Sequence, residues 1–570
     1  MPERNVSIAS VLNEIADLLD IQGANAFRVR AYRNAARSIG DLGTEVDVLM
    51  ERGTPLTDIP GVGEDLSRKI VEILHTGTCE FLQRLHTELP ATITQLLKIP
   101  ALGPRRVKTL YQDLHIENLE QLLAAAQAGQ IRELPGFGEK TEQRILETVQ
   151  GRIAMARRHP LVLAAGYAEP LADYLRAIPG VSRVEIAGSY RRMRASVGDI
   201  DMVAVAAPGS SIMERFVAYP AVTQVLSKGP TRSSVLLEAG LQVDLRSLPE
   251  PSFGAAMVYF TGSKAHNIAI RRMGQERGLK INEYGVFREA LCIAGDTEES
   301  VYSTIDLPWI PAELREDKGE IEAAQHRGLP HLIQTSDVRG DLQLRLTPGE
   351  APEAIIQEAG GRGLAYVAIV VDIPDRATFG IARAMQEIAQ LRSVKLVPSA
   401  PTVLVGIEAG IDGAGNLDVA DSVLDLFDLT VASVHGGLDM PHSEQTQRVL
   451  TALDSDRVAI LAQPWSDGES TVDFDFAAVA RKATERGIAL AVSLHPRRIA
   501  PPETFLEIAK REGARFVISS EAGSAAELDA LQFSVGFARR AGIEPAQVLN
   551  SNPISDLQAW LRGHKQRAGR

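Results

Sequence analysis

IAGSYRR at residues 186–192, followed by SVGDIDMV at residues 196–203, is the most informative part of this 570-residue chain. A Gly-Ser turn leads into arginines, and a second glycine opens an apolar run with two aspartates one residue apart. If this run is a strand, Asp199 and Asp201 share one face while Ile200 and Met202 point into the core. Neighbouring carboxylates repel each other, and a divalent cation with hard oxygen ligands is the commonest reason to place them together.

The Gly-Ser turn and the arginines upstream of the aspartates suit phosphate. Backbone N–H groups and guanidinium groups are the donors that phosphate oxygens accept from. A metal site beside a polyphosphate site is typical of phosphoryl or nucleotidyl transfer. The alternative, a strand end with two solvated aspartates, is common for an isolated Asp-x-Asp, but the upstream motif disfavours it.

A third carboxylate follows in a predicted β-hairpin. Its arms are Ser234–Leu237 and Leu241–Leu248, with a turn near Gly240, and the second arm carries Asp244. In an antiparallel sheet this arm can lie beside the Asp-x-Asp strand. Three carboxylates can hold two metal ions and leave coordination sites for substrate oxygens.

Composition describes an ordinary water-soluble chain of several domains. Hydrophobic residues make up 45% and charged residues 23%, and no apolar run is long enough to cross a bilayer. The charged N-terminus does not resemble a signal peptide, so we expect a cytoplasmic, nucleoid-associated protein. Cys79 and Cys292 are the only cysteines, which excludes a disulfide framework and a four-cysteine zinc site. A net charge of −13 argues against a general basic field, so any nucleic acid must be bound by local features.

A short glycine-containing turn occurs three times in the N-terminal part. The copies are Ile59–Gly63 (IPGVG), Ile99–Gly103 (IPALG) and Leu134–Gly138 (LPGFG), each followed by a predicted helix with basic residues. Such a turn exposes the first amides of the next helix, which can bind a phosphate together with the helix dipole. The pattern resembles the helix-hairpin-helix motif, a sequence-independent DNA-backbone grip. The alternative is three turns that serve packing alone.

The C-terminal part alternates strand-like runs with helices, which predicts a parallel α/β barrel. The predicted strands are Tyr366–Val371, Ser393–Val397, Leu429–Val434, Arg457–Ala462, Ala489–Leu494 and Phe516–Ser519.

Together these features resemble a family X DNA polymerase of the bacterial type. The similarity continues through Tyr259–Ser263 (YFTGS) and Lys280–Gly285 (KINEYG), and it spans about residues 1–320. It implies a metal-binding catalytic triad that holds two divalent cations, Mg²⁺ or Mn²⁺: Asp199, Asp201 and Asp244. It implies the following contacts to the incoming nucleotide: Gly188, Ser189, Arg192, Gly198, Tyr259, Phe260, Gly262 and Asn267. It implies these contacts to template or DNA backbone: Arg271, Gly61, Gly63, Gly103, Gly136 and Gly138.

The resemblance also divides the chain into domains. We expect a lyase-like helical domain at 1–85, fingers at 86–155, a nucleotidyltransferase palm at 156–250, a thumb at 251–320 and a barrel at 337–570. Lys69 matches the amine that forms a Schiff base in lyase-active members. Asp65 replaces a second lysine of that pocket, and an acidic neighbour raises a lysine pKa, which opposes nucleophilic use. A phosphate contact is the alternative role for Lys69.

The barrel resembles the PHP (polymerase and histidinol phosphatase) domain, whose relatives bind metals through nine ligands. Here the opening Asp-Leu-His-x-His pattern is Asp341–Arg345 (DLQLR), and Asp372-Ile373, Gln463-Pro464 and Glu521-Ala522-Gly523 each lack a histidine. The residual ligands are Glu350, Glu408, His435 and Glu521. Gln, Arg, Ile and Gly do not replace imidazole, and Arg345 places a cation where a metal would sit. A three-metal nuclease site is therefore not expected, and the metal site is absent or partial.

The predicted function is DNA-directed synthesis that fills short gaps in repair, with gapped or primer-template DNA and dNTPs as partners of a monomer. Three alternatives remain: a template-independent nucleotidyltransferase, a 3′-5′ exonuclease in the barrel, and a DNA-binding scaffold. The hairpins and the thumb pattern disfavour a template-independent nucleotidyltransferase. The lost ligands disfavour an exonuclease, and the carboxylate triad disfavours a scaffold.

Overall fold

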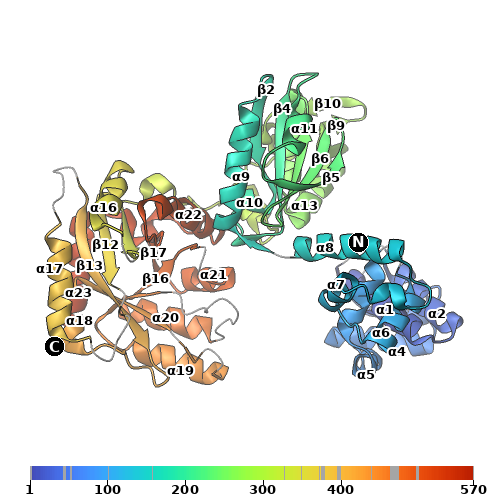
Figure 1. Cartoon of the computed structure of the whole chain (residues 1–570), viewed down its shortest axis with the longest axis horizontal. Helices are drawn as coiled ribbons and strands as arrows, with labels where there is room; N and C mark the ends of the chain where they lie inside the picture. The colour runs from blue at the N-terminus through green and yellow to red at the C-terminus, as the bar shows by residue number, and fades with distance from the viewer. Residues whose placement is uncertain are drawn as a thin grey trace. The chain divides into compact units, whose positions relative to one another are not determined.

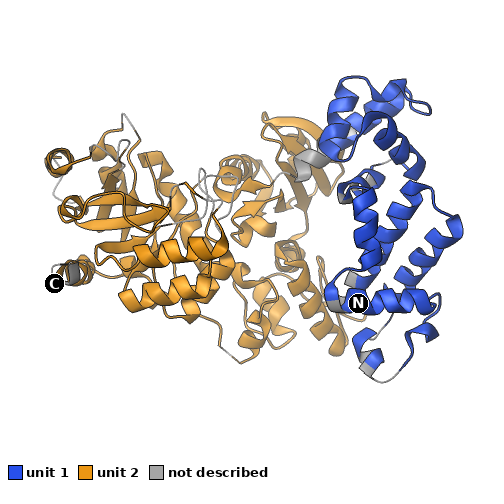
Figure 2. Ribbon diagram, turned by 90° about the horizontal axis from the view of Figure 1, so that it is seen from below, with its two compact units in different colours: residues 1–157 blue, residues 158–570 orange. Residues whose placement is uncertain are grey.

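The computed structural model describes residues 3–40, 42, 46–51, 54–99, 102–156, 158–326, 328–347, 350–371, 373, 379–394, 400–434, 436–437, 440–462, 474–495 and 500–568. The chain forms two compact units, residues 1–157 and 158–570, which are coloured separately in Figure 2. No described helix is long and apolar enough to span a membrane.

The first unit is helical. Leu12, Ile15 and Leu18 recur at helical spacing and are fully buried, so the first helix forms the centre of this unit's core. Its helices are α1 (Glu3–Gln22), α2 (Ala26–Gly40), α3 (Val46–Glu51), α4 (Glu64–Thr76), α5 (Glu80–Glu88), α6 (Pro104–Leu114), α7 (Leu119–Gln127) and α8 (Glu139–Ala156). Short 3₁₀ helices precede the three glycine turns at Leu56–Asp58, Ala91–Lys98 and Ile131–Glu133.

The second unit begins with residues 158–250, the segment predicted to form the palm, all of which are described. Its strands form one mixed sheet in the order β2-β4-β7-β6-β5. Their bounds are β2 (Val181–Ile186), β4 (Asp199–Ala206), β5 (Val222–Lys228), β6 (Arg232–Leu237) and β7 (Gln242–Ser247). The short strands β1 (His159–Pro160) and β3 (Ser196–Val197) pair with each other, and the helices are α9 (Leu161–Arg176), α10 (Gly188–Arg191) and α11 (Ile212–Val217).

The thumb follows without a break. It contains α12 (Phe253–Thr261), α13 (Lys264–Glu276), α14 (Glu298–Ser303) and α15 (Glu320–Gln325), with an antiparallel sheet of β8 (Leu279–Asn282), β9 (Gly285–Arg288) and β10 (Leu291–Ala294).

Among the described residues after 336, seven parallel strands form one sheet in sequence order, surrounded by helices (Figure 1). The strands are β11 (Gly340–Leu344), β12 (Tyr366–Val371), β13 (Thr402–Ile411), β14 (Leu429–Val434), β15 (Val458–Leu461), β16 (Ala489–Val492) and β17 (Arg515–Ile518). The helices are α16 (Pro352–Gly361), α17 (Ile381–Arg392), α18 (Asp421–Leu424), α19 (His442–Ala452), α20 (Phe476–Arg486), α21 (Glu503–Arg511), α22 (Ala530–Arg540) and α23 (Ile554–Ala568).

A buried amide closes this sheet into a nearly complete barrel. The Asn550 Nδ2 atom donates to the Gly340 carbonyl of β11 and to the Ile518 carbonyl of β17, each at 2.6 Å, and its Oδ1 accepts from the Ile518 N–H at 3.0 Å. The side chain therefore supplies bonds between the first and last strands that a ladder would otherwise make.

The expected fold class is confirmed, with two departures in detail. Of the strand predicted at Ser393–Val397, only Ser393 and Val394 are described, and Ser393 is the C-cap of α17. Strands β11 and β13 were not predicted. The other predicted barrel strands agree with β12, β14, β15, β16 and β17 to within two residues at each end.

Candidate active site

The two aspartates of the Asp-x-Asp motif lie at the start of β4, with Ile200 and Met202 fully buried beneath them. Strand β7 runs beside β4 and pairs Asp244 with Asp201. The pairing is parallel, so the expected antiparallel arrangement is wrong. Helix α11 and the strands β5 and β6 intervene between β4 and β7, and the chain therefore returns to β4 in the same direction.

Gly188 brings the predicted phosphate-binding turn against the carboxylates. It has φ +62°, and a Cβ atom there would lie 2.7 Å from Asp201 Oδ2. The neighbouring Ala187 N–H donates to the Asp201 carbonyl at 2.7 Å. Only glycine combines this backbone conformation with this close approach.

An open cavity of about 610 Å³ gathers the predicted nucleotide-binding residues. Its lining includes all eight of them, two of the three aspartates and the predicted template contact: Gly188, Ser189, Arg192, Gly198, Asp199, Asp201, Tyr259, Phe260, Gly262, Asn267 and Arg271. Asp244 is buried on the adjacent strand, where it accepts hydrogen bonds from Ser234 Oγ and, at 3.0 Å, from Gln242 Nε2.

The residues on the thumb side of the cavity are held in place by contacts with one another. Asn267 Nδ2 donates to the Tyr259 carbonyl at 2.7 Å, and the Arg271 guanidinium lies 4.8 Å from the centre of the Tyr259 ring. The buried Oδ1 atom of Asn267 has no hydrogen-bond partner among the described residues, which leaves an acceptor in this wall. Arg192 Nη1 donates to the Thr261 carbonyl and joins the palm to the thumb turn.

The negative charges gathered around the carboxylates favour a bound cation. Burial and the negative charges of Asp199 and Asp244 raise the pKa of Asp201 to about 7. In the described part of the chain, no three His, Cys, Asp or Glu side chains converge into a ready-made cage. The arrangement fits Mg²⁺-like ions, which proteins bind through one or two carboxylates while substrate phosphates and waters complete the shell.

Several functional neighbours had no signal in the sequence. Burial and the charge of Asp244 raise the pKa of Asp199, and Arg158, which lines the cavity, opposes this rise. Of the motif arginines Arg191, Arg192 and Arg194, only Arg192 is in the cavity lining, and Arg191 instead forms two 2.8 Å bonds to Glu298. Glu316 accepts from Arg192 Nε at 2.9 Å. Glu298 and Glu316 lie 107 and 124 residues from the arginines they bind, so no local spacing could have indicated them.

The comparisons with known proteins agree with this geometry. Residues 256–316 match the family described as DNA polymerase beta thumb, residues 3–79 match a helix-hairpin-helix domain, and residues 93–150 match a SAM-like helix-hairpin-helix tandem. DNA polymerase/3'-5' exonuclease PolX of Bacillus subtilis is 28% identical over 97% of this chain and 99% of its own length. The chain is similar to the family X DNA polymerases.

Two further relatives match parts of this chain. DNA polymerase lambda of Arabidopsis thaliana is 22% identical over 55% of this chain and 62% of its own length. A Holliday junction branch migration complex subunit RuvA of Methylibium petroleiphilum is 29% identical over 30% of this chain and 86% of its own length.

In the first unit, each glycine turn lies between a 3₁₀ helix and an α-helix. Within the turns, the N–H groups of Val62, Leu102 and Phe137 donate to carbonyls three residues earlier at 3.0–3.1 Å. Gly61 and Gly136 have φ +83°, and Gly63 and Gly103 are the N-caps of α4 and α6.

The helices after the turns differ in charge. The first turn of α4 carries Glu64 and Asp65, and that of α8 carries Glu139 and Glu142, whereas α6 has no acidic residue in its first turn. Acidic side chains at a helix N-terminus oppose a bound phosphate. The second turn therefore offers the most favourable phosphate site of the three.

Lys69 lies in a cavity of about 380 Å³ with Asp65, Arg68 and Arg84. Its ammonium group lies 2.5 Å from Asp65 Oδ2 and 5.4 Å from the centre of the Phe81 ring. The hydrogen bond from Lys69 lowers the pKa of Asp65. The contact disfavours a nucleophilic role, and the assignment of Lys69 stays a prediction.

In the barrel, Arg345 lies between two of the residual ligands. Its Nη1 atom forms an ion pair with Glu408, and its Nε atom lies 3.5 Å from Glu521 Oε2. Both carboxylates are buried, and Ser493 Oγ donates to Glu521 Oε1 at 2.5 Å. Glu350 is exposed, and His435 lies outside the described residues. The donor set around Arg345 does not fit a metal centre, because a guanidinium occupies the space between the carboxylates.

Proposed function

We propose that this chain is a DNA-directed DNA polymerase that adds dNTPs to a primer 3′-hydroxyl and fills short gaps during repair. The observation that carries this proposal is the single cavity in which a phosphate-binding turn, two aspartates and the thumb residues meet. The relatives named DNA polymerase support it, and so does the thumb family matched at residues 256–316.

The palm residues would hold the reacting groups. Asp199, Asp201 and Asp244 would bind two divalent cations, Mg²⁺ or Mn²⁺. Once bound, such cations activate the primer hydroxyl and neutralise charge that develops on the phosphates. Ser189 and Arg192 would donate hydrogen bonds to the triphosphate, together with the Gly198 amide.

The thumb residues would select and orient the substrates. Tyr259, Phe260 and Gly262, at the C-terminal end of α12, lie in the cavity wall where the nucleotide sugar would pack. Asn267 is fixed by its bond to the Tyr259 carbonyl, and its unpartnered Oδ1 can accept from the nascent base pair. Arg271, stacked on Tyr259, would contact the template.

The glycine turns of the first unit would bind DNA backbones through N–H groups and helix N-termini. This mode is independent of sequence. It also suits a chain with a net charge of −13, because it needs no extended basic surface.

Single-nucleotide insertion into a one-nucleotide gap tests the proposal. Asp199→Ala removes a ligand whose loss should cost about 4 kcal/mol of transition-state stabilisation, on the order of a thousand-fold in rate. DNA binding should be unchanged in a band-shift assay. Asp173→Ala is the control, because Asp173 is an exposed aspartate that pairs with Arg176.

Retained insertion by Asp199→Ala would contradict the proposal. Equal extension of a gapped duplex and of an unpaired 3′ end would instead indicate a template-independent nucleotidyltransferase. We do not extend the proposal to an exonuclease, because Arg345 occupies the space between the residual carboxylates of the barrel.

A further inference from the structure

The barrel contacts the phosphate-binding turn of the palm through one face of α22. Phe533 packs edge-on against Tyr190 at 6.4 Å between ring centres, and Gly536 approaches Met193 so closely that a Cβ would lie 2.5 Å from Met193 Cγ. Arg540 Nη1 donates to the Arg192 carbonyl at 2.6 Å. Positions 533, 536 and 540 are three and four residues apart and therefore share a helix face.

The backbone that α22 covers is strained. Met193 ends the α10 turn with φ +52°, a conformation that residues other than glycine rarely adopt. Such a conformation persists only where the surroundings hold it in place. Here the surroundings include Gly536, which the Met193 side chain approaches, and Arg540, which donates to the carbonyl of the preceding Arg192.

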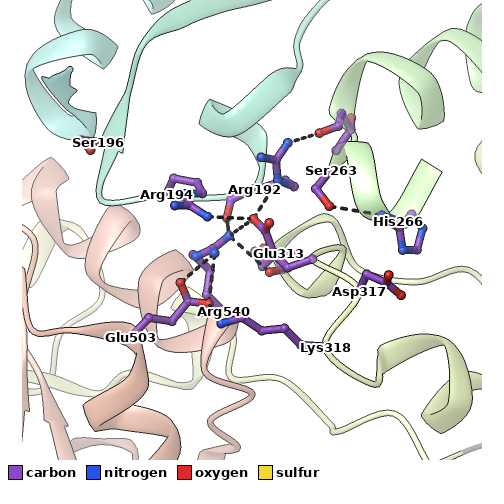
Figure 3. Close-up of polar contacts among 12 residues, drawn as sticks. Arg192, Arg194, Ser196, Ser263, His266, Glu313, Asp317, Lys318, Glu503 and Arg540 are labelled. Atoms are coloured by element: carbon purple, nitrogen blue, oxygen red, sulfur yellow. Dashed lines mark hydrogen bonds and ion pairs between the residues drawn. The ribbon is translucent and has the colours of Figure 1, made fainter. Parts of the chain in front are cut away.

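Arg540 also reaches the Arg192 side chain indirectly. Its Nη1 lies 3.1 Å from Glu316 Oε1, the same oxygen that accepts from Arg192 Nε at 2.9 Å. The other edge of the guanidinium forms 3.0 Å and 2.8 Å bonds to Glu503 of α21 (Figure 3). The Arg540 side chain is fully buried, so its charge is compensated only by these partners.

Neither Arg540 nor Glu316 lines the nucleotide cavity, whereas Arg192 does. Arg192 is thus fixed at three points: its carbonyl by Arg540, its Nε by Glu316, and its Nη1 by the Thr261 carbonyl. In the described residues its Nη2 atom takes no part in these contacts and can donate to a ligand.

We propose that Arg540 is a positioning residue for nucleotide binding, through which the C-terminal barrel holds Arg192 in the orientation that receives the triphosphate. This inference rests on the proposed polymerase function. It gives the barrel a role that requires no metal: the barrel supports the nucleotide site of the palm.

Steady-state insertion of one dNTP into a one-nucleotide gap, with the full-length chain, tests the inference. Arg540→Ala should raise KM for the dNTP about tenfold and change kcat less than about twofold, because it loosens Arg192 without touching the aspartates. Arg540→Lys should restore part of the loss, since it keeps the charge but not the two-pronged bond to Glu503.

Arg539→Ala is the matched control. Arg539 is the neighbouring arginine of α22 and also reaches out of the barrel, with a 2.6 Å bond to Glu313, but it does not contact Arg192. Its KM should stay within about twofold of the parent value. Circular dichroism and gapped-DNA binding of each variant report whether the fold is kept. Should Arg540→Ala fail to fold, Glu316→Gln, which keeps the shape but removes the charge, should raise KM for the dNTP several-fold.

A double variant separates positioning from general stability. If Arg540 acts through Arg192, adding Arg540→Ala to Arg192→Ala should change KM for the dNTP no further. An unchanged KM in both Arg540→Ala and Glu316→Gln would overturn the inference, as would equal losses in the Arg539 and Arg540 variants. If the parent chain itself inserts no nucleotide, the proposed function fails instead.

Discussion

Gly188 is the residue on which the carboxylate geometry depends most directly, because its missing side chain leaves room for Asp201. We predict that Gly188→Ala lowers gap-filling about a hundred-fold, since displacing a catalytic group by about 1 Å has an effect of that size. The measurement is single-turnover insertion with saturating dNTP.

Gly209→Ala controls for backbone strain. Gly209 has φ +80°, but a Cβ there would meet nothing within 4 Å. Both substitutions should lower stability by about 1–2 kcal/mol, because both force alanine into the left-handed region. Only Gly188→Ala should also lose activity. Equal activities would show that the contact with Asp201 does not matter.

At the scale of elements, the closure of the barrel depends on Asn550, a fully buried side chain that bonds to both β11 and β17. Asn550→Leu removes three hydrogen bonds and leaves buried backbone groups without these partners, which should cost about 3 kcal/mol. We predict that native-state hydrogen exchange accelerates in β11 and β17 and changes little in the palm.

Asn552→Ala serves as the control, because the Asn552 amide bonds only to the Val548 and Leu549 carbonyls nearby. Its effect should be about 1 kcal/mol. Faster exchange throughout the second unit in the Asn550 variant would mean that the barrel opens with the palm and not at the β11–β17 seam.

The elements differ in how well the sequence predicts them. The Asp-x-Asp strand and the glycine turns have short-range patterns, and both lie where the patterns place them. Strand β13 was missed because Gly406 and Gly410 interrupt its apolar run. The direction of β7 could not be predicted, since side chains alternate in the same way in parallel and antiparallel pairs. The contact of Arg540 with Arg192 spans 348 residues and leaves no local pattern at all.

At the scale of the whole molecule, a net charge of −13 means that DNA must be bound at a few local sites. We predict that Arg105→Ala lowers the slope of log affinity against log salt by about one, because one phosphate contact is lost. Arg105 is exposed in the first turn of α6, which lacks acidic residues. The measurement is fluorescence anisotropy with gapped DNA at several salt concentrations.

Lys140→Ala provides the comparison. Lys140 is also exposed and follows the third glycine turn, but Glu139 and Glu142 share its first turn. The salt slope should change much less. Equal changes in slope would show that the acidic residues do not weaken the third turn.

The contact between α22 and the α10 turn also limits which changes to the barrel can be tolerated during evolution. The apolar core of the palm runs without interruption into that of the barrel, through neighbours such as Tyr190 and Phe533. During evolution, the metal ligands of the barrel can therefore be substituted one at a time while the contact between the barrel and the palm is kept. Deleting the whole domain would instead uncover this core and release Arg192 in a single step. The residual ligand positions of the barrel can therefore change without affecting the palm, whereas the α22 face that contacts the palm has to be kept.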